Sequence, residues 1–276
     1  MSDCARSSFQ QRLMAVVVTS CLAGCADRLA SKPGVYDTSH EMIDLAKRSI
    51  DVTYVKPTTP HSPAVLVVFA TGDAGWFGAS GLVFEHMAEK GYYLAGFDSR
   101  TVVAPNSKTG ERDNISDAGV ALESMFDRAK RALGLPETTH VIVTGDSRGA
   151  TMVIFASAEK HLRDEVRGAV AIALTREVDY LNAPPLAERN PAIQVDDKGR
   201  IQIYPVLSHL DTIPIAVIQS THDRYVPSAE SRRLMGPDTP MLRLYEVKAR
   251  NHGFDGGRDQ LLADLDDALS WIESKQ

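Results

Sequence analysis

The chain has 276 residues, of which 43% are hydrophobic, and a formal net charge of −6 at pH 7. This length suffices for a single domain with a large core, and the acidic balance argues against non-specific nucleic-acid binding, which requires a basic surface. The eight histidines and three cysteines show no spacing typical of a metal site, so we expect no bound metal and no other cofactor.

Residues 1–24 are predicted to be a lipoprotein signal peptide. Two arginines precede the apolar stretch at residues 13–21, which is too short to span a bilayer, since that takes roughly 20 apolar residues. The sequence Leu22-Ala23-Gly24-Cys25 resembles a bacterial lipobox, which implies that Cys25 is lipidated. By the same resemblance, an alanine after Cys25 favours the outer membrane over the inner. We therefore expect a lipid-anchored protein on the periplasmic side of the bacterial envelope. An ordinary signal peptide with a coincidental cysteine is the alternative.

The rest of the chain divides into a short N-terminal segment and one domain. We assign residues 25–48 to a lipid-anchored tether and N-terminal segment, and residues 49–276 to the domain. Strand-like and helix-like runs alternate in the domain, which predicts an α/β fold with a mostly parallel sheet and helices on both faces. The predicted strands are residues 49–56, 64–70, 92–98, 141–144, 168–174, 213–223 and 242–247, and the predicted helices are residues 81–90, 116–133 and 259–271.

A Gly-x-Ser-x-Gly pentapeptide at residues 145–149 lies between a predicted strand and a helix-like run at residues 150–156. This is the context of a nucleophile elbow, where the serine occupies a tight turn and the glycines let neighbouring backbone approach it. Ser147 is therefore the candidate nucleophile.

Two further candidates follow later strands. Asp223 ends the predicted strand at residues 213–223, and His252 lies just past the one at residues 242–247. A serine hydroxyl needs histidine as its base and a carboxylate to fix the histidine tautomer. The chain order Ser147, Asp223, His252 is that of the α/β-hydrolase fold. The sequence alone leaves Asp211 and Asp255 open as alternative acids.

An oxyanion hole is expected beside this triad. Its first donor is the backbone N–H of Arg148, the residue after the nucleophile. Its second donor is expected in the glycine-containing loop after the strand at residues 64–70, at Asp73 or Ala74. Residues 175–211 interrupt the alternation with several prolines and a polar turn, and we interpret them as a lid insertion over the active site.

Four segments together resemble the VirJ/AcvB family of bacterial virulence proteins, over roughly residues 60–275. They are Thr71-Gly72-Asp73-Ala74-Gly75-Trp76, Gly96-Phe97-Asp98-Ser99, Gly145-Asp146-Ser147-Arg148-Gly149-Ala150 and Asn251-His252-Gly253-Phe254-Asp255-Gly256. The resemblance implies an exported α/β-hydrolase-like protein associated with type IV secretion and with hydrolysis of aminoacylated phosphatidylglycerol. The chain departs from the family at the elbow, where Asp146, Arg148 and Thr151 replace the usual tyrosine, phenylalanine and aspartate.

These features predict an exported, membrane-anchored serine hydrolase that cleaves a carboxylic ester. The resemblance implies an aminoacylated phospholipid as its substrate and secretion-system proteins as its partners. Asp73 and Asp146 are candidates for attracting a cationic aminoacyl group, and Trp76 and Phe77 for contacting lipid. One alternative is a dienelactone-hydrolase-like enzyme or general carboxylesterase. The other is a non-catalytic envelope lipoprotein that uses the hydrolase scaffold to bind a partner in secretion.

Overall fold

The computed structural model describes residues 29–45, 48–103, 113–159, 162, 165–183 and 192–275. The predicted signal peptide and the lipidation candidate Cys25 lie outside the described residues. In the part of the chain that is described, no helix has both the length and the apolar character needed to cross a membrane.

Eight strands form one sheet in the order β1-β2-β4-β3-β6-β7-β12-β13. The pairs β1–β2 and β2–β4 are antiparallel, and all the other neighbours are parallel. The mostly parallel sheet predicted from the alternation is therefore confirmed. Its strands are β1 (Tyr36–Leu45), β2 (Arg48–Pro57), β3 (Leu66–Ala70), β4 (Tyr93–Phe97), β6 (Val141–Asp146), β7 (Val166–Ile172), β12 (Ile215–Ser220) and β13 (Leu242–Val247).

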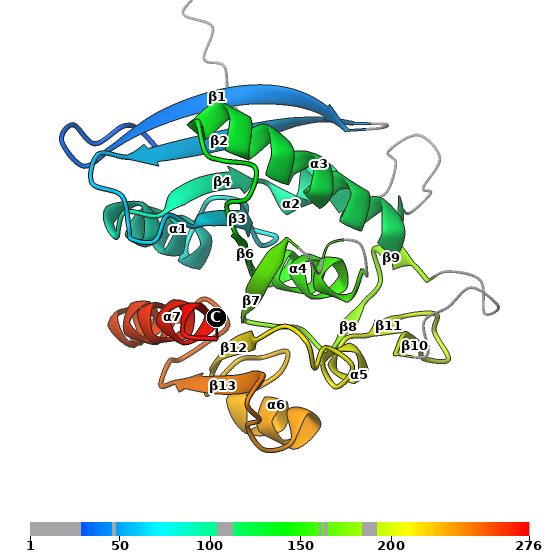
Figure 1. Ribbon diagram of the computed structural model, residues 1–276. Helices are drawn as coiled ribbons and strands as arrows, with labels where there is room; N and C mark the ends of the chain where they lie inside the picture. Colours follow the sequence, from blue (N-terminus) through cyan, green and yellow to red (C-terminus); the bar gives the residue numbers. More distant parts are fainter. Residues whose placement is uncertain are drawn as a thin grey trace, which may run out of the picture.

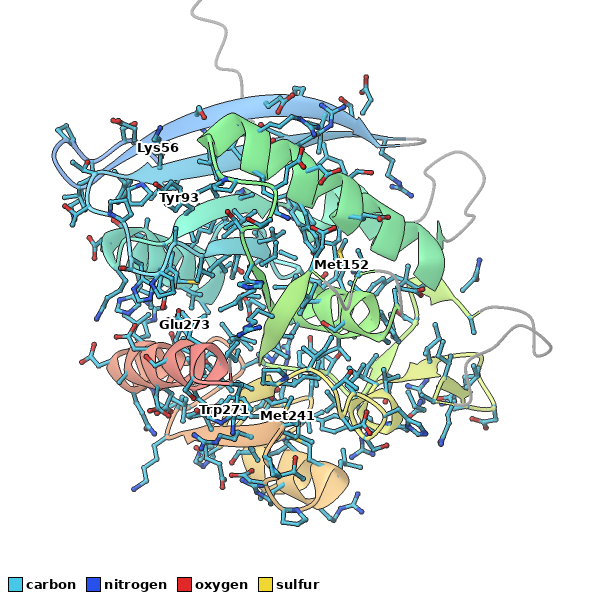
Figure 2. All side chains as sticks on the ribbon, in the orientation of Figure 1. Lys56, Tyr93, Met152, Met241, Trp271 and Glu273 are labelled. Carbon is cyan, nitrogen blue, oxygen red and sulfur yellow. The ribbon has the colours of Figure 1, made fainter. Side chains whose placement is uncertain are left out.

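Helices cover both faces of this sheet (Figure 1). Helices α1 (Ala79–Glu89) and α7 (Arg258–Glu273) bury their apolar faces in one core layer, and α3 (Ile115–Leu133) and α4 (Arg148–Ala158) bury theirs in the other. Figure 2 labels one core residue from each layer, Trp271 of α7 and Met152 of α4. The shorter helices are α2 (Ser99–Val103), α5 (Tyr204–Leu207) and α6 (Ser228–Met235).

The central strands are buried on both faces, as expected for a parallel sheet covered by helices. All residues of β3 are buried, and alternate residues enter opposite core layers. Burying apolar side chains contributes roughly 25 cal/mol per Å² removed from water. This packing fixes the carboxyl ends of β3, β6, β12 and β13, and the loops that follow these strands carry the site.

The sheet begins within residues 25–48, which were predicted from the sequence to be a tether and N-terminal segment. Tyr36–Leu45 forms β1, which pairs with β2 over ten residues. The strand is mostly polar because it is an edge strand, and its sequence therefore lacks a clear apolar alternation. Among the side chains described over residues 36–44, only those of Tyr36 and Ile43 are buried. The side chain of Glu41 accepts a hydrogen bond from Tyr54 of β2.

The insertion predicted at residues 175–211 contains short elements, described over residues 175–183 and 192–211. Strands β10, β11 and β8 form a small antiparallel sheet, and β9 pairs with β5. Arg200 ties this sheet together by binding Asp196 and Glu177. The strands within the insertion are β8 (Glu177–Val178), β9 (Leu181–Asn182), β10 (Gln194–Val195) and β11 (Ile201–Gln202), whereas β5 (Asp113–Asn114) directly precedes α3.

Candidate active site

Ser147 occupies a tight turn between β6 and α4. Its φ is 51° and its ψ is −108°, a backbone conformation that costs about 1–3 kcal/mol for a residue other than glycine. A Cβ on Gly149 would lie 2.0 Å from the carbonyl oxygen of Ala70, and one on Gly145 would lie 2.3 Å from the carbonyl carbon of Gly149. Only glycine fits at these two positions, as the elbow hypothesis requires.

The structure brings the three predicted triad residues into one hydrogen-bonded chain. Nε2 of His252 lies 2.9 Å from Oγ of Ser147, and Nδ1 of His252 lies 2.7 Å from Oδ2 of Asp223. Asp223 has a fully buried side chain, whereas the side chain of His252 is 21% exposed. The histidine is therefore accessible to a ligand, while the carboxylate stays away from water.

The carboxylate of Asp223 is held by several donors. Its Oδ1 accepts hydrogen bonds from the backbone N–H groups of Tyr225 and Val226, at 2.8 and 3.4 Å. Its Oδ2 accepts a hydrogen bond from Nε2 of Gln219 at 2.9 Å, beside the bond from His252. Gln219 was not among the residues predicted from the sequence, although a lone amide in the buried strand β12 is a usable signal, since buried polar groups need partners.

The other two candidate acids lie elsewhere. Asp255 accepts a hydrogen bond from the side chain of Asn251 and closes the loop that carries His252. This hydrogen bond, together with the charge of Arg258, lowers the pKa of Asp255. Asp211 is exposed at the end of the insertion. Within the described residues, Asp223 is the only carboxylate that is hydrogen-bonded to His252.

The loop between β3 and α1 lies against the elbow. A Cβ on Gly72 would be 3.3 Å from Cβ of Ser147. The bond from N of Gly75 to O of Gly72, at 3.0 Å, closes a turn whose two central residues are Asp73 and Ala74. In the described part of the chain, the backbone N–H groups of Asp73 and Ala74 have no hydrogen-bond partner.

Arg148 connects three parts of the site. It begins α4, and the first N–H groups of a helix have no partner within the helix. Its guanidinium donates to Asp73 and stacks on the ring of Tyr180 at 3.9 Å, and Tyr180 in turn donates to the carbonyl of Arg148. The side chain of Arg148 thus joins the elbow, the loop after β3 and the insertion.

Most of the side chains predicted from the sequence to recognise the substrate bind other groups of the protein. Asp73 is paired with Arg148, and the buried Asp146 accepts a hydrogen bond from Ser80, so neither is free to attract a cation. Trp76 packs against Phe84, with ring centroids 4.9 Å apart, and serves the core. Phe77 is 62% exposed.

A pocket of about 630 Å³ opens at Ser147, and the insertion supplies most of its wall. Its lining is largely charged. The three arginines in it are each paired with a carboxylate, whereas Asp179 is exposed and has no ion-pair partner among the described residues. The lining residues are Asp73, Ser147, Arg148, Thr175, Arg176, Glu177, Asp179, Tyr180, Asp196, Arg200, Gln202 and Tyr225.

Comparison with solved structures identifies the architecture. Esterase Pf2001 from Pyrococcus furiosus is 16% identical, with a TM-score of 0.61 over 85% of this chain and 90% of that one. Est1E from Butyrivibrio proteoclasticus is 16% identical, with a TM-score of 0.56 over 85% of this chain and 99% of that one. Naproxen esterase from Bacillus subtilis is 12% identical, with a TM-score of 0.56 over 85% and 92%.

The chain has the α/β-hydrolase fold. No known family model matches it, and no curated protein sequence matches it. The resemblance to the VirJ/AcvB family therefore stays a prediction. At these identities the solved structures establish the fold alone, so the function must be argued from the site.

Proposed function

We propose that the protein is a serine hydrolase that cleaves a carboxylic ester. The proposal rests on the continuous hydrogen-bonded chain from Ser147 through His252 to the buried Asp223. A hydroxyl bonded to an imidazole, which is itself oriented by a carboxylate, is the arrangement that activates serine for attack on a carbonyl carbon.

In this mechanism Oγ of Ser147 attacks the ester carbonyl while Nε2 of His252 takes its proton. Asp223 keeps the remaining proton on Nδ1 and stabilises the imidazolium. The backbone N–H of Arg148 and that of Asp73 or Ala74 donate hydrogen bonds to the oxyanion. Each donor that is already oriented stabilises the transition state by about 3 kcal/mol. The imidazolium then protonates the leaving alcohol, and water hydrolyses the acyl-enzyme through the same groups.

The charge of the pocket bears on the class of ester. Because its arginines are paired and Asp179 is not, we propose that it accepts neutral or cationic esters better than anionic ones. An aminoacyl ester carries a positively charged ammonium group and therefore belongs to the esters that this pocket is proposed to accept. The aminoacylated phospholipid implied by the resemblance belongs to this class.

A matched series of p-nitrophenyl esters tests the proposed function. Their acyl chains have equal length and end in a methyl, an ammonium or a carboxylate group. We expect the purified protein to hydrolyse the first two, and we expect Asp179→Asn to lower kcat/KM for the ammonium ester about fivefold, the effect of roughly 1 kcal/mol from an exposed ion pair.

Asp127→Asn is the matched control, because Asp127 is an exposed carboxylate on α3, away from the pocket lining. It should leave all three rates unchanged. Hydrolysis of none of the esters would refute the hydrolase proposal. A preference for the carboxylate ester, unaffected by Asp179→Asn, would refute the charge preference alone.

A further inference from the structure

The mechanism leaves one buried carboxylate beside the nucleophile without a role. Asp146 ends β6 and directly precedes Ser147, and only 9% of it is exposed. Burial raises the pKa of this carboxyl group, because removing a charge from water is unfavourable. A buried carboxyl group needs a hydrogen-bond partner, and Oδ2 of Asp146 accepts one from Oγ of Ser80 at 2.7 Å.

Ser80 connects this carboxylate to the loop after β3. It is fully buried on α1, and its Oγ also accepts a hydrogen bond from the backbone N–H of Gly72 at 3.1 Å. A hydroxyl can donate and accept at once, so Ser80 bridges the residue before the nucleophile and the loop opposite it. A side chain at position 72 would be crowded by the elbow, since a Cβ there would lie 3.1 Å from Oδ2 of Asp146.

The bridge acts at the start of the turn that carries the unpartnered amides. The carbonyl of Gly72 closes this turn by accepting from N of Gly75. Nη1 of Arg100 donates to the carbonyl of Asp73 at 3.2 Å and holds the next peptide unit. Gly72, Asp73 and Gly75 are thus held from within the protein, while the N–H groups of Asp73 and Ala74 are left without a partner in the described structure.

We propose that Asp146 and Ser80 are positioning residues for the oxyanion hole. Asp146 orients the hydroxyl of Ser80, this hydroxyl fixes the N–H of Gly72, and Gly72 sets the direction of the amides at Asp73 and Ala74. The inference rests on the proposed ester hydrolysis. Donors that are already oriented stabilise a developing oxyanion without reorganisation, and small misplacements are costly. The bridge therefore acts on the transition state more than on substrate binding.

Ser80→Ala tests the inference, measured with the methyl-terminated p-nitrophenyl ester. We expect kcat to fall about tenfold to a hundredfold, below the loss of about 100- to 1,000-fold for deleting a donor outright, with KM changed by less than about twofold. The peptide containing Gly72 should exchange its amide hydrogens faster, because the N–H of Gly72 loses its acceptor. This second readout does not depend on catalysis.

The Asp146 variants and a matched serine separate positioning from general loss of packing. Asp146→Asn should retain most of kcat, because its amide oxygen can still accept from Ser80, whereas Asp146→Ala should reproduce the loss seen with Ser80→Ala. Ser157→Ala is the control, since Ser157 is equally buried but donates only to Val153 within α4. It should change neither kcat nor exchange at Gly72.

The outcomes distinguish this inference from the proposed function. If the parent protein hydrolyses the ester and Ser80→Ala keeps the parental kcat and exchange rate, the positioning inference is wrong. If Ser80→Ala does not fold, a parental kcat in Asp146→Ala would likewise show that the positioning inference is wrong. If the parent hydrolyses no ester, the proposed function fails, and the catalytic role of the bridge fails with it.

Discussion

Replacing His252 with alanine is expected to lower kcat for ester hydrolysis about a million-fold, the size of effect that follows loss of the base from a working triad. The physical reason is the contact between Nε2 of His252 and Oγ of Ser147 at 2.9 Å. Without the imidazole, no described side chain is placed to take the proton of the serine, and a neutral hydroxyl attacks esters slowly.

The measurement is the steady-state rate with the methyl-terminated p-nitrophenyl ester, together with the thermal midpoint of unfolding. His222→Ala is the matched control, because His222 lies exposed near Asp223 but bonds to Thr221 and the carbonyl of Ala249. The control should keep kcat within about twofold, as expected for an exposed substitution away from the chemistry. A folded His252→Ala variant with kcat within tenfold of the parent would contradict the mechanism.

Replacing Asp223 with asparagine is expected to lower kcat about ten-thousand-fold, because asparagine imposes the wrong histidine tautomer. Oδ1 of Asp223 accepts hydrogen bonds from the N–H groups of Tyr225 and Val226. In the asparagine variant the amide oxygen would take the position of Oδ1, because only an acceptor fits there, and the NH₂ group would take the position of Oδ2. That NH₂ group would face Nδ1 of His252 and Nε2 of Gln219, which itself donates. The imidazole would then carry its proton on Nε2, where it cannot accept one from Ser147.

Variants of the two other candidate acids supply the comparison. Asp255→Asn should lower stability, since Asp255 binds Asn251 and Arg258, yet it should leave kcat within about threefold. Asp211→Asn should change neither kcat nor the thermal midpoint of unfolding. If Asp255→Asn lost more activity than Asp223→Asn at equal folded fraction, the assignment of Asp223 as the orienting carboxylate would be wrong.

The sequence predicted the fold and the residues that gather at the site because both depend on local patterns. Buried parallel strands appear as short apolar runs, and Ser147, Asp223 and His252 each follow one of them. The carboxyl ends of parallel strands lie at one edge of the sheet, where ligands of such folds bind. Three residues far apart in the chain could therefore be placed together without a structure.

The remaining features depend on contacts that no local pattern encodes. Strand β1 is mostly polar and joins the sheet at its edge through its pairing with β2. The pairing of Asp73 with Arg148 joins residues 75 positions apart, so the sequence could not show that this carboxylate is occupied. Ser80 is a single serine near the start of α1, and nothing in its neighbours indicates that it touches both Gly72 and Asp146.

Labelling with a fluorophosphonate probe measures directly whether Ser147 is an activated nucleophile. The probe forms a covalent bond with a serine whose proton is taken by a neighbouring base, and it requires no knowledge of the natural ester. The purified protein is expected to gain one label on Ser147, while Ser147→Ala and His252→Ala, folded to the same extent, gain none. Absence of label on the folded parent, or equal labelling of Ser147→Ala, would show that Ser147 is not an activated nucleophile.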